Sequence, residues 1–436
     1  MQRMKQILLD DGSATGNIKR AIDFQYMKTL RFNLKPLNAW PGNRIEGNNS
    51  KYMVLINLTI MALNAFTLSS SYHYMKTNWE SLTFYELGHM YIIVLMTLCC
   101  LTRLFLTLPQ STKFINVGEL FLTKMHLIYF KETPEQATQT YRKVNFFCHL
   151  FTVYLTGQML AGMALFNINP MWSNYSSGKF KQRILHNTTY EHSLYLSMPP
   201  LKIYTHFNAY VVGCIINWFL SYLCSICFCM LDLLLSLIIF NVWGHLKILL
   251  NDLASFPLPA NDIVVSMDDR YASVSAEMYS EDELKLISQR LRDCIDYHRL
   301  IMDFTDKVSG AYGSMLFVYY GFHQVSGCLL LLECSQMTPE ALIRYLPLSL
   351  ILFQQLIQLS IIFELVGSTS EKLKDAVYDV PWQCMDTKNR KMVAMFLYNV
   401  QEPIHLKALG VVNVGVTTMA TVLKTSLSYF TFLRSM

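Results

Sequence analysis

The sequence predicts an all-α membrane protein with seven transmembrane helices. Its 436 residues are 52% apolar and only 15% charged, and the mean hydropathy is +0.26, a combination that is unusual for a soluble globular protein. Seven separate apolar stretches are each long enough for the roughly 20 residues that cross a hydrocarbon core as a helix. The segments between them alternate between strongly and weakly basic, as expected for a chain that crosses the bilayer repeatedly.

The first three predicted spans cover residues 52–72, 85–108 and 144–167. The fourth, Phe207 to Phe240, is longer than a bilayer requires. About 34 residues make a helix about 50 Å long, whereas the hydrocarbon core is about 30 Å thick. We therefore expect the fourth helix to tilt or to project beyond the membrane.

The hydrophilic segment after the fourth span ends in a predicted amphipathic helix. Ser280 and Glu283 form a capping box, and apolar residues follow at helical spacing from Leu284 onward. We expect this helix to continue into the fifth span, residues 308–332. The sixth predicted span covers residues 341–366.

Two short helices are predicted between the sixth and seventh spans, where Pro381 and Pro403 interrupt residues 367–407. The seventh span is the last apolar stretch, Ala408 to Leu433. Its outer end lies close to the end of the chain at Met436.

The distribution of charge predicts the orientation. Most of the 36 Lys and Arg residues fall in the N-terminal segment and in residues 109–143, 241–307 and 367–407. Basic loops stay in the cytoplasm, so we expect the N-terminus inside and the C-terminus outside, opposite to a G-protein-coupled receptor. The loop after the third span is then extracellular, and we expect its two sequon asparagines, Asn174 and Asn187, to be glycosylated.

The seventh stretch is unusually polar for a lipid-facing helix. Thr418, Thr421, Thr425 and Ser428 recur at steps of three and four residues and lead to Phe432, so they share one helix face. A hydroxyl stripe that ends at an aromatic residue suits a pore-lining helix. Small hydroxylated residues also let two helices approach closely, and the stripe alone leaves both interpretations open.

Aromatic and mildly polar residues recur on the outer halves of the second to fifth spans. Such a lining suits a small, mostly apolar ligand, because burial supplies affinity while one or two hydrogen bonds orient the molecule. The candidate ligand-binding residues are Tyr85, His89, Gln158, Gly162, Tyr210, Cys214, Asn217, Tyr319, Phe322 and His323. For any one of them taken alone, ordinary helix packing or an interfacial aromatic belt is the simpler explanation.

The sequence carries no pattern of an enzyme, a metal site or a cofactor site. P-loop, zinc-protease, dinucleotide-binding and nucleophile-elbow motifs are absent. Most of the 11 cysteines lie in apolar stretches, where a thiol packs as a small hydrophobic group. The net charge of +5 gives no reason to expect nucleic acid as a partner. The first apolar run, Ile7 to Leu9, is too short for a secretory signal.

Three stretches resemble insect odorant receptors. The ending LKTSLSYFTFL (Leu423 to Leu433) resembles the C-terminal signature of that family, with departures nearby at Met419 and Leu427. ELVGSTSEKLKDAVYDVPW (Glu364 to Trp382) resembles its linker and the following short helix, which ends in Tyr and Trp. MPPLKIYTHFNAYVV resembles the segment before its fourth span.

The resemblance implies an odorant-gated, non-selective cation channel in the plasma membrane of olfactory neurons. This chain would be a tuning subunit that forms a tetramer with the family's co-receptor. In the pore, Thr421, Thr425 and Ser428 would line the wetted part, and Phe432 and Met436 would narrow the outer mouth. We expect Lys424 to turn toward a neighbouring helix or the cytoplasmic vestibule, because a cation facing the pore would oppose cation flow.

On this interpretation residues 1–366 hold six spans and an extracellular-side ligand pocket, and residues 367–436 hold cytoplasmic anchor helices and the pore helix. Leu291 and Val377 are expected on apolar faces of the cytoplasmic subunit interface. A gustatory receptor, working without a co-receptor, is an alternative that usually ends in a different motif. A secondary transporter would carry an internal repeat, and we find none in the sequence.

Overall fold

The computed structural model describes residues 18–45, 51–82, 84–107, 112–130, 135–180, 189–260, 263–266, 273–276, 278–335 and 339–435. Within these residues, seven long helices make up most of the fold. They are α3 (Lys51–Thr77), α4 (Phe84–Thr107), α6 (Glu135–Ser176), α7 (Phe207–Ala254), α8 (Glu281–Cys334), α9 (Pro339–Ser370) and α12 (Val416–Ser435). Each corresponds to one of the seven predicted spans.

Five of the described helices, α4, α6, α7, α8 and α9, are both long and apolar enough to cross a membrane. The other two, α3 and α12, are long enough at 27 and 20 residues but carry more hydroxyl and amide side chains. A helix of 20 residues is about 30 Å long, which matches the hydrocarbon core.

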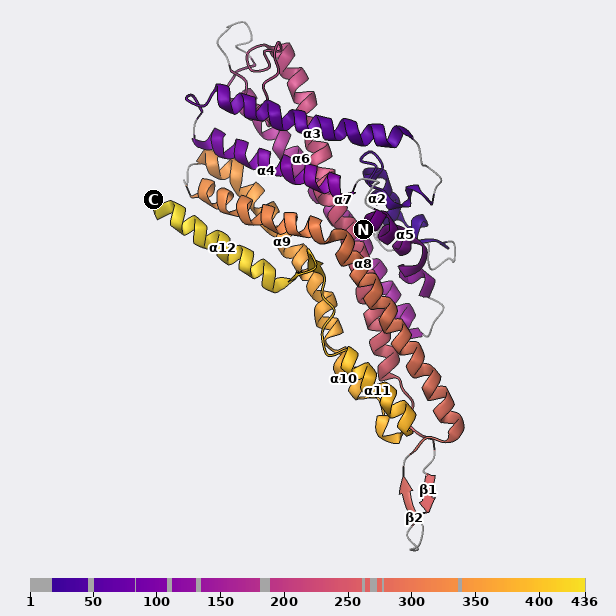
Figure 1. Cartoon of the computed structure of the whole chain (residues 1–436). Coiled ribbons are helices and arrows are strands. Elements are labelled where there is room, and N and C mark those ends of the chain that lie inside the picture. The colour runs from indigo at the N-terminus through magenta and orange to yellow at the C-terminus, as the bar shows by residue number, and fades with distance from the viewer. Residues whose placement is uncertain are drawn as a thin grey trace.

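Three helices extend far beyond a bilayer. α6, α7 and α8 contain 42, 48 and 54 residues, or about 63, 72 and 81 Å at 1.5 Å per residue. The lower halves of α7 and α8 in Figure 1 form a stem with α10 (Leu373–Tyr378) and α11 (Thr387–Asn399). The expectation that the fourth helix exceeds the membrane is confirmed, and the third is longer than the 24 residues predicted for it.

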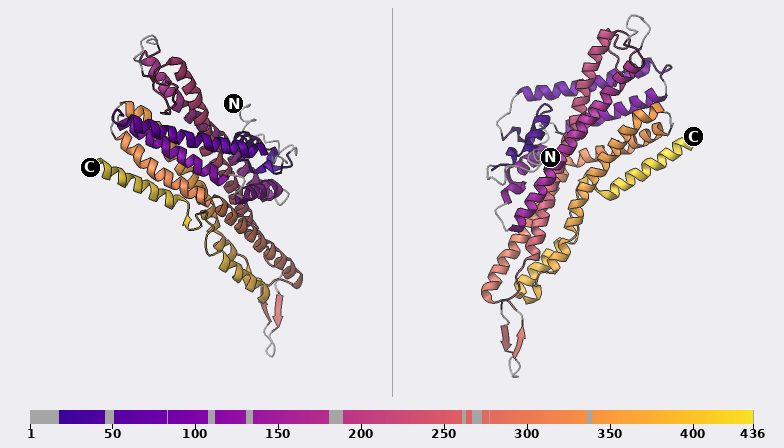
Figure 2. Two further views of the ribbon diagram at one scale, coloured as in Figure 1. Left: turned by 45° about the horizontal axis from the view of Figure 1, so that its top comes forward. Right: turned by 180° about the vertical axis from the view of Figure 1, so that it is seen from behind.

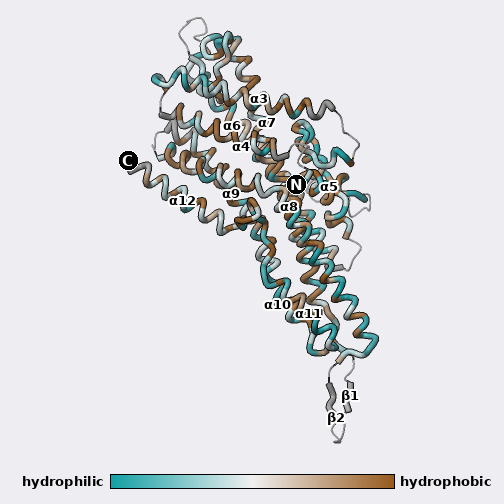
Figure 3. The backbone as a smooth tube through the Cα atoms, in the orientation of Figure 1, coloured by the Kyte–Doolittle hydropathy of each residue, from teal (hydrophilic) through white to brown (hydrophobic). Residues whose placement is uncertain are grey.

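The start of α8 follows the predicted capping box. Ser280 Oγ accepts from the backbone N–H of Glu283, and the Glu283 carboxylate accepts from the backbone N–H of Ser280 at 2.7 Å. From there α8 runs unbroken from the stem into the bundle, as predicted. Its hydropathy changes along the way from mixed to mainly apolar (Figure 3).

The seventh helix begins later than predicted. Residues Lys407–Ala408 (β3) pair with Val412–Asn413 (β4) in a small antiparallel hairpin, and α12 starts at Val416. Leu409 and Gly410 turn the chain with φ of 51° and 73°. The hairpin packs on α8, where the Leu409 N–H donates to the Gly313 carbonyl at 3.2 Å. A Cβ atom at position 313 would lie 3.0 Å from the Lys407 carbonyl oxygen, so this close approach favours glycine.

A layer of short helices covers one side of the bundle. α2 (Gln25–Leu34) buries Tyr26, Met27 and Leu30 and contacts α6 and α7. The turn η3 (Pro41–Asn43) packs on α5 (Thr112–Leu120). Views from other directions show α2 and α5 close to the end of the bundle where α3 begins (Figure 2). Beyond the stem, at one end of the molecule, Ile263–Ser266 (β1) and Ser273–Ala276 (β2) form an antiparallel hairpin (Figure 1).

Candidate ligand site and pore helix

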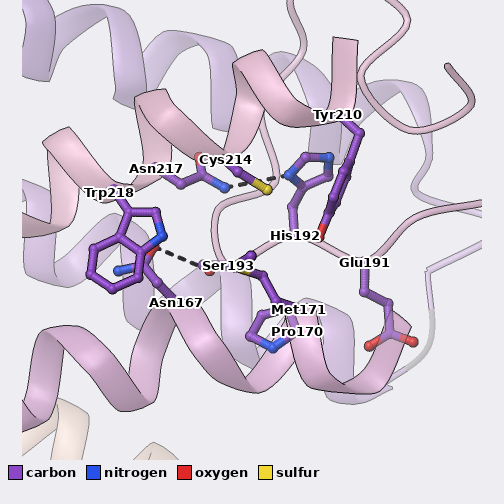
Figure 4. Close-up of a pocket in the computed structure, with 10 residues that line it drawn as sticks. All are labelled: Asn167, Pro170, Met171, Glu191, His192, Ser193, Tyr210, Cys214, Asn217 and Trp218. Atoms are coloured by element: carbon purple, nitrogen blue, oxygen red, sulfur yellow. Dashed lines mark hydrogen bonds between the residues drawn. The ribbon is translucent and has the colours of Figure 1, made fainter. Parts of the chain in front are cut away.

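A small cavity lies between the C-terminal part of α6, the loop that follows it and the start of α7 (Figure 4). Its volume is about 10 Å³, which is room for a single water molecule. Its lining consists of Asn167, Pro170, Met171, Glu191, His192, Ser193, Tyr210, Cys214, Asn217 and Trp218. Drug-sized ligands occupy sites of about 300 Å³ or more, so a ligand requires side chains here to move apart.

His192 is the central polar group of this cavity. Its Nε2 lies 3.0 Å from the Ile203 carbonyl, and because a carbonyl only accepts, Nε2 carries the proton. Its Nδ1 is therefore free to accept, and Asn217 Nδ2 lies 3.5 Å away. Burial lowers the pKa of His192, while the bond to Ile203 partly opposes that shift. The ring is thus held neutral, with one acceptor nitrogen facing α7.

Asn174 fixes the same loop to α7. Its Nδ2 donates to the Glu191 carbonyl at 2.9 Å and to Tyr210 Oη at 3.1 Å, and its Oδ1 accepts from the Glu191 N–H at 2.9 Å. The side chain is fully buried. A glycan on Asn174 is incompatible with this arrangement, so the structure contradicts our expectation for that sequon. Asn187 lies outside the described residues, and its glycosylation stays a prediction.

Four of the ten predicted ligand-site residues gather at this end of the bundle. Tyr210, Cys214 and Asn217 line the cavity. His89, on α4, contacts the same loop, since its Nε2 donates to the Ser193 carbonyl at 2.9 Å. Tyr210, Cys214 and Asn217 are one turn or two apart on α7, and the loop after α6 contributes residues to the same lining.

Three other predicted positions are separate from the cavity. Gln158 donates to Gln354 Oε1 on α9 at 2.9 Å, which links α6 to α9. Gly162 borders open space, because a side chain there would meet no atom within 4 Å. The side chain of Tyr85 lies outside the described residues.

Tyr319, Phe322 and His323 do not line the cavity either. They are buried on α8, and the rings of Tyr319 and His323 pack with centroids 4.3 Å apart. The centre of this cluster is an ion pair in which Arg103 Nη2 of α4 donates to Asp232 Oδ1 of α7. The predicted pocket shared by Tyr319, His323, His89 and Gln158 is therefore replaced by a packed polar cluster.

The ion pair also contacts aromatic faces. The guanidinium carbon of Arg103 lies 5.3 Å from the ring centre of Phe228 and 5.7 Å from that of Tyr319. Within the described residues, Arg103 Nε and Nη1 and Tyr319 Oη have no hydrogen-bond partner. Our sequence interpretation missed this pair, although the signal was present: each residue is a lone charge in an apolar stretch, and buried charges in membranes are paired.

The stripe on α12 lies on its outward face. Phe432 is 60% exposed, and Thr421 and Ser428 are also exposed. The opposite face packs on α8, where Ser426 is buried and Gln324 Nε2 donates to Ser426 Oγ at 3.3 Å. A helix contact within this chain therefore does not explain the stripe. Met436 lies outside the described residues.

Two charged residues flank the stripe. Lys424 is exposed on the same side of α12, and its expected direction, toward a neighbouring helix or the cytoplasmic vestibule, stays a prediction. The carboxylate of Glu364 on α9 accepts from the Val416 N–H at 3.1 Å, where an anion complements the N-terminus of a helix. This contact fixes the start of α12 to α9.

Leu291 and Val377 are fully buried inside the stem of the single chain. In the stem, α8 and α10 each contact α7 and α11, so these two residues are covered within the chain rather than forming a face for another subunit, and that assignment was wrong. The apolar side chains that remain uncovered on α11 are Met395 and Tyr398, which are 69% and 81% exposed.

With this geometry established, comparison with known proteins assigns the family. Residues 83–427 match the sequence family described as 7tm Odorant receptor. The chain belongs to this odorant receptor family. Members of the family are receptors rather than enzymes, as the absence of catalytic motifs indicated.

Individual relatives agree with the assignment. The receptor is 27% identical to odorant receptor 85c of Drosophila melanogaster over 180 residues, which are 40% of this chain and 45% of that protein. It is 21% identical to odorant receptor 22b of the same species over 153 residues, or 34% and 37% of the two chains. The matched part thus spans less than half of each of these relatives.

The fold of the receptor is similar to that of the insect olfactory receptor OR5 from Machilis hrabei. The TM-score is 0.72 at 14% identity, with 94% of this chain and 97% of the other covered. For the same receptor in complex with eugenol the TM-score is 0.70, with 94% and 99% covered. At this identity the similarity shows the seven-helix fold.

Proposed function

We propose that the receptor is a subunit of an odorant-gated, non-selective cation channel, which binds a small volatile molecule in its helix bundle and opens a central pore together with a co-receptor. The observation that carries the proposal is the family match over residues 83–427. A receptor of the same fold has been solved with eugenol bound, which supports a small organic ligand.

The ligand site that we favour is the small cavity between α6 and α7. Asn217 and the acceptor nitrogen of His192 offer hydrogen bonds to one polar group of a ligand, while Trp218 and Met171 offer apolar surface. His89 and Tyr210 hold the covering loop through Ser193 and Asn174. Displacement of this loop would enlarge the cavity, which links ligand binding to a change of structure.

The pore helix that we favour is α12. In a tetramer its outward stripe of Thr421, Thr425 and Ser428 would face the central axis, and Phe432 would narrow the outer mouth. The Thr425 hydroxyl donates to the Thr421 carbonyl at 2.7 Å, which leaves its oxygen lone pairs to face water and cations. An apolar constriction at Phe432 would close the channel by excluding water.

The partner that we propose is the co-receptor, joined through the stem in the cytoplasm. The exposed Met395 and Tyr398 on α11 give the stem an apolar face, and such faces are usually covered by protein. With the N-terminus inside, as the distribution of charge predicts, this face would lie in the cytoplasm and the cavity would lie on the outer side of the plasma membrane.

Co-expression in oocytes tests the function. Volatile esters, alcohols, aldehydes and aromatics are applied to cells that express the receptor with the co-receptor, the receptor alone, or the co-receptor alone. The proposal expects a current evoked by particular odorants only when both chains are present. Robust current from the receptor alone would favour a gustatory-type channel, and accumulation of ligand against its gradient would favour a transporter.

A further inference from the structure

We propose that the exposed face of α2 and the segment after it bind anionic phospholipids of the cytoplasmic leaflet. This N-terminal face consists of Lys28, Phe32, Lys35, Arg44 and Ile45. The proposal concerns a lipid site that is separate from the odorant site and from the pore.

The face is the side of α2 that no other part of the described chain covers. Tyr26, Leu30 and Leu34 are buried toward α6 and α7. On the opposite side, Phe32 is 74% exposed and Lys28 is exposed as well. Lys28 and Lys35 lie four residues before and three residues after Phe32, so all three side chains share one helix face.

Its position relative to the membrane follows from the connection to α3. Only five residues separate the exposed Ile45 from Lys51, where the first span begins. The six steps from residue 45 to residue 51 reach at most about 22 Å. Figures 1 and 2 show α2 close to the same end of α3 from three directions. The face is therefore at the level of the bilayer surface.

The charge of the face complements an anionic surface. Asp23 is the only acidic residue between positions 18 and 45, and Arg20 pairs with it at 3.4 Å. Lys28 and Lys35 thus have no acidic residue within four positions along the chain, whereas Glu46 follows Arg44 by two residues. Lys113 adds a further exposed cation on α5, which packs on the turn just before Arg44.

The combination favours lipid over a soluble partner. An aromatic ring flanked by lysines is the arrangement of helices that lie in the membrane interface, where the ring enters the acyl region and the lysine stems extend to the headgroups. Basic side chains near the cytoplasmic leaflet attract its anionic lipids. Phe32 and Ile45 would insert, and the three cations would select phosphatidylserine over phosphatidylcholine.

Native mass spectrometry of the full-length receptor tests this. The protein is purified in micelles that contain equal amounts of phosphatidylserine and phosphatidylcholine, and the lipids retained are counted. We expect the wild type to retain phosphatidylserine preferentially. The variant Lys28→Gln/Lys35→Gln should lower the phosphatidylserine to phosphatidylcholine ratio by about fivefold per lysine. Phe32→Ala should lower retention of both lipids.

The matched control is Lys285→Gln/Leu286→Ala at the start of α8. Leu286 is 73% exposed next to an exposed lysine, but it lies at the far end of the stem. This control should keep the wild-type ratio.

An unchanged ratio of phosphatidylserine to phosphatidylcholine in the α2 variant, or an equal fall in the control, would overturn the proposal. A lower number of receptor subunits per complex in the α2 variant, with an unchanged lipid ratio, would also overturn the proposal, because the face would then contact protein. If the α2 variant melts below the wild type in phosphatidylcholine micelles, Arg44→Gln replaces it.

Discussion

Arg103 and Asp232 form an ion pair that joins α4 to α7 in the interior of the helix bundle. Both side chains are almost fully buried, and the pair lies against the rings of Phe228 and Tyr319. Breaking such a pair leaves an uncompensated charge in a medium of low dielectric constant, whereas replacing both partners by apolar groups is often neutral.

Asp232→Asn should therefore lower the stability of the receptor by about 3–5 kcal/mol, seen as a lower melting temperature in detergent and less protein at the surface. Arg103→Met/Asp232→Leu should recover much of that loss. Lys179→Met, which breaks the half-exposed pair with Glu191, should cost at most about 1 kcal/mol. Equal losses for the three variants would mean that the buried pair has no special role.

His126 makes stability depend on pH. Burial, with a contribution from His245, lowers the pKa of His126 to about 3, and its Nδ1 accepts from the Ile128 N–H while Nε2 bonds Tyr26 Oη at 2.8 Å. In the unfolded chain the pKa is about 6.5. Between pH 6.5 and 3 the unfolded state binds the extra proton, so stability falls as pH falls, by about 1.4 kcal/mol per pH unit from this residue. The difference in melting temperature between the wild type and His126→Gln should be smallest at pH 4.5, because only the wild type loses stability through this histidine. A constant offset from pH 7.5 to 4.5 would contradict this.

Asn217 and Tyr319 should behave differently when replaced by alanine. Loss of the hydrogen-bonding group at Asn217 should raise the odorant concentration for half activation five- to a hundredfold, or about 1–3 kcal/mol, with normal surface levels. Tyr319→Ala removes a buried ring beside Arg103 and should instead reduce the amount of folded receptor, at a cost of about 3–5 kcal/mol. Dose-response curves normalised to surface biotinylation separate the two effects. The opposite assignment of phenotypes would place the ligand near Tyr319.

The stem offers a comparison of buried and exposed apolar residues. Met395→Asp on the exposed side of α11 should reduce co-purification with the co-receptor while the free subunit keeps its melting temperature. Leu291→Asp should destabilise the subunit itself, because Leu291 is buried within the chain. Normal assembly of Met395→Asp would show that this side of α11 faces solvent.

The sequence predicted the helices better than the site. Local signals are sufficient for Ser280 and Glu283, whose capping box starts α8 where it was expected. Hydropathy alone cannot separate α12 from the preceding hairpin, since residues 408–415 are as apolar as a span and only the docking on Gly313 distinguishes them. Tyr319 satisfied the composition of a ligand site, but its environment is set by Arg103, which is more than 200 positions away in the chain. Asn174 matches a sequon whose burial depends on a tertiary contact with Tyr210.

The most direct test of the account is the relative cation permeability of the odorant-evoked current after Phe432→Ser, recorded with the co-receptor. A polar side chain at the constriction should let water remain there, so we expect current without odorant and a reversal potential shifted from the wild-type value. Leu427→Ser, on the flank of the exposed side of α12, is the control and should leave both unchanged. If Phe432→Ser is silent without odorant and keeps the wild-type reversal potential while Leu427→Ser changes both, the stripe of Thr421, Thr425 and Ser428 does not line the pore.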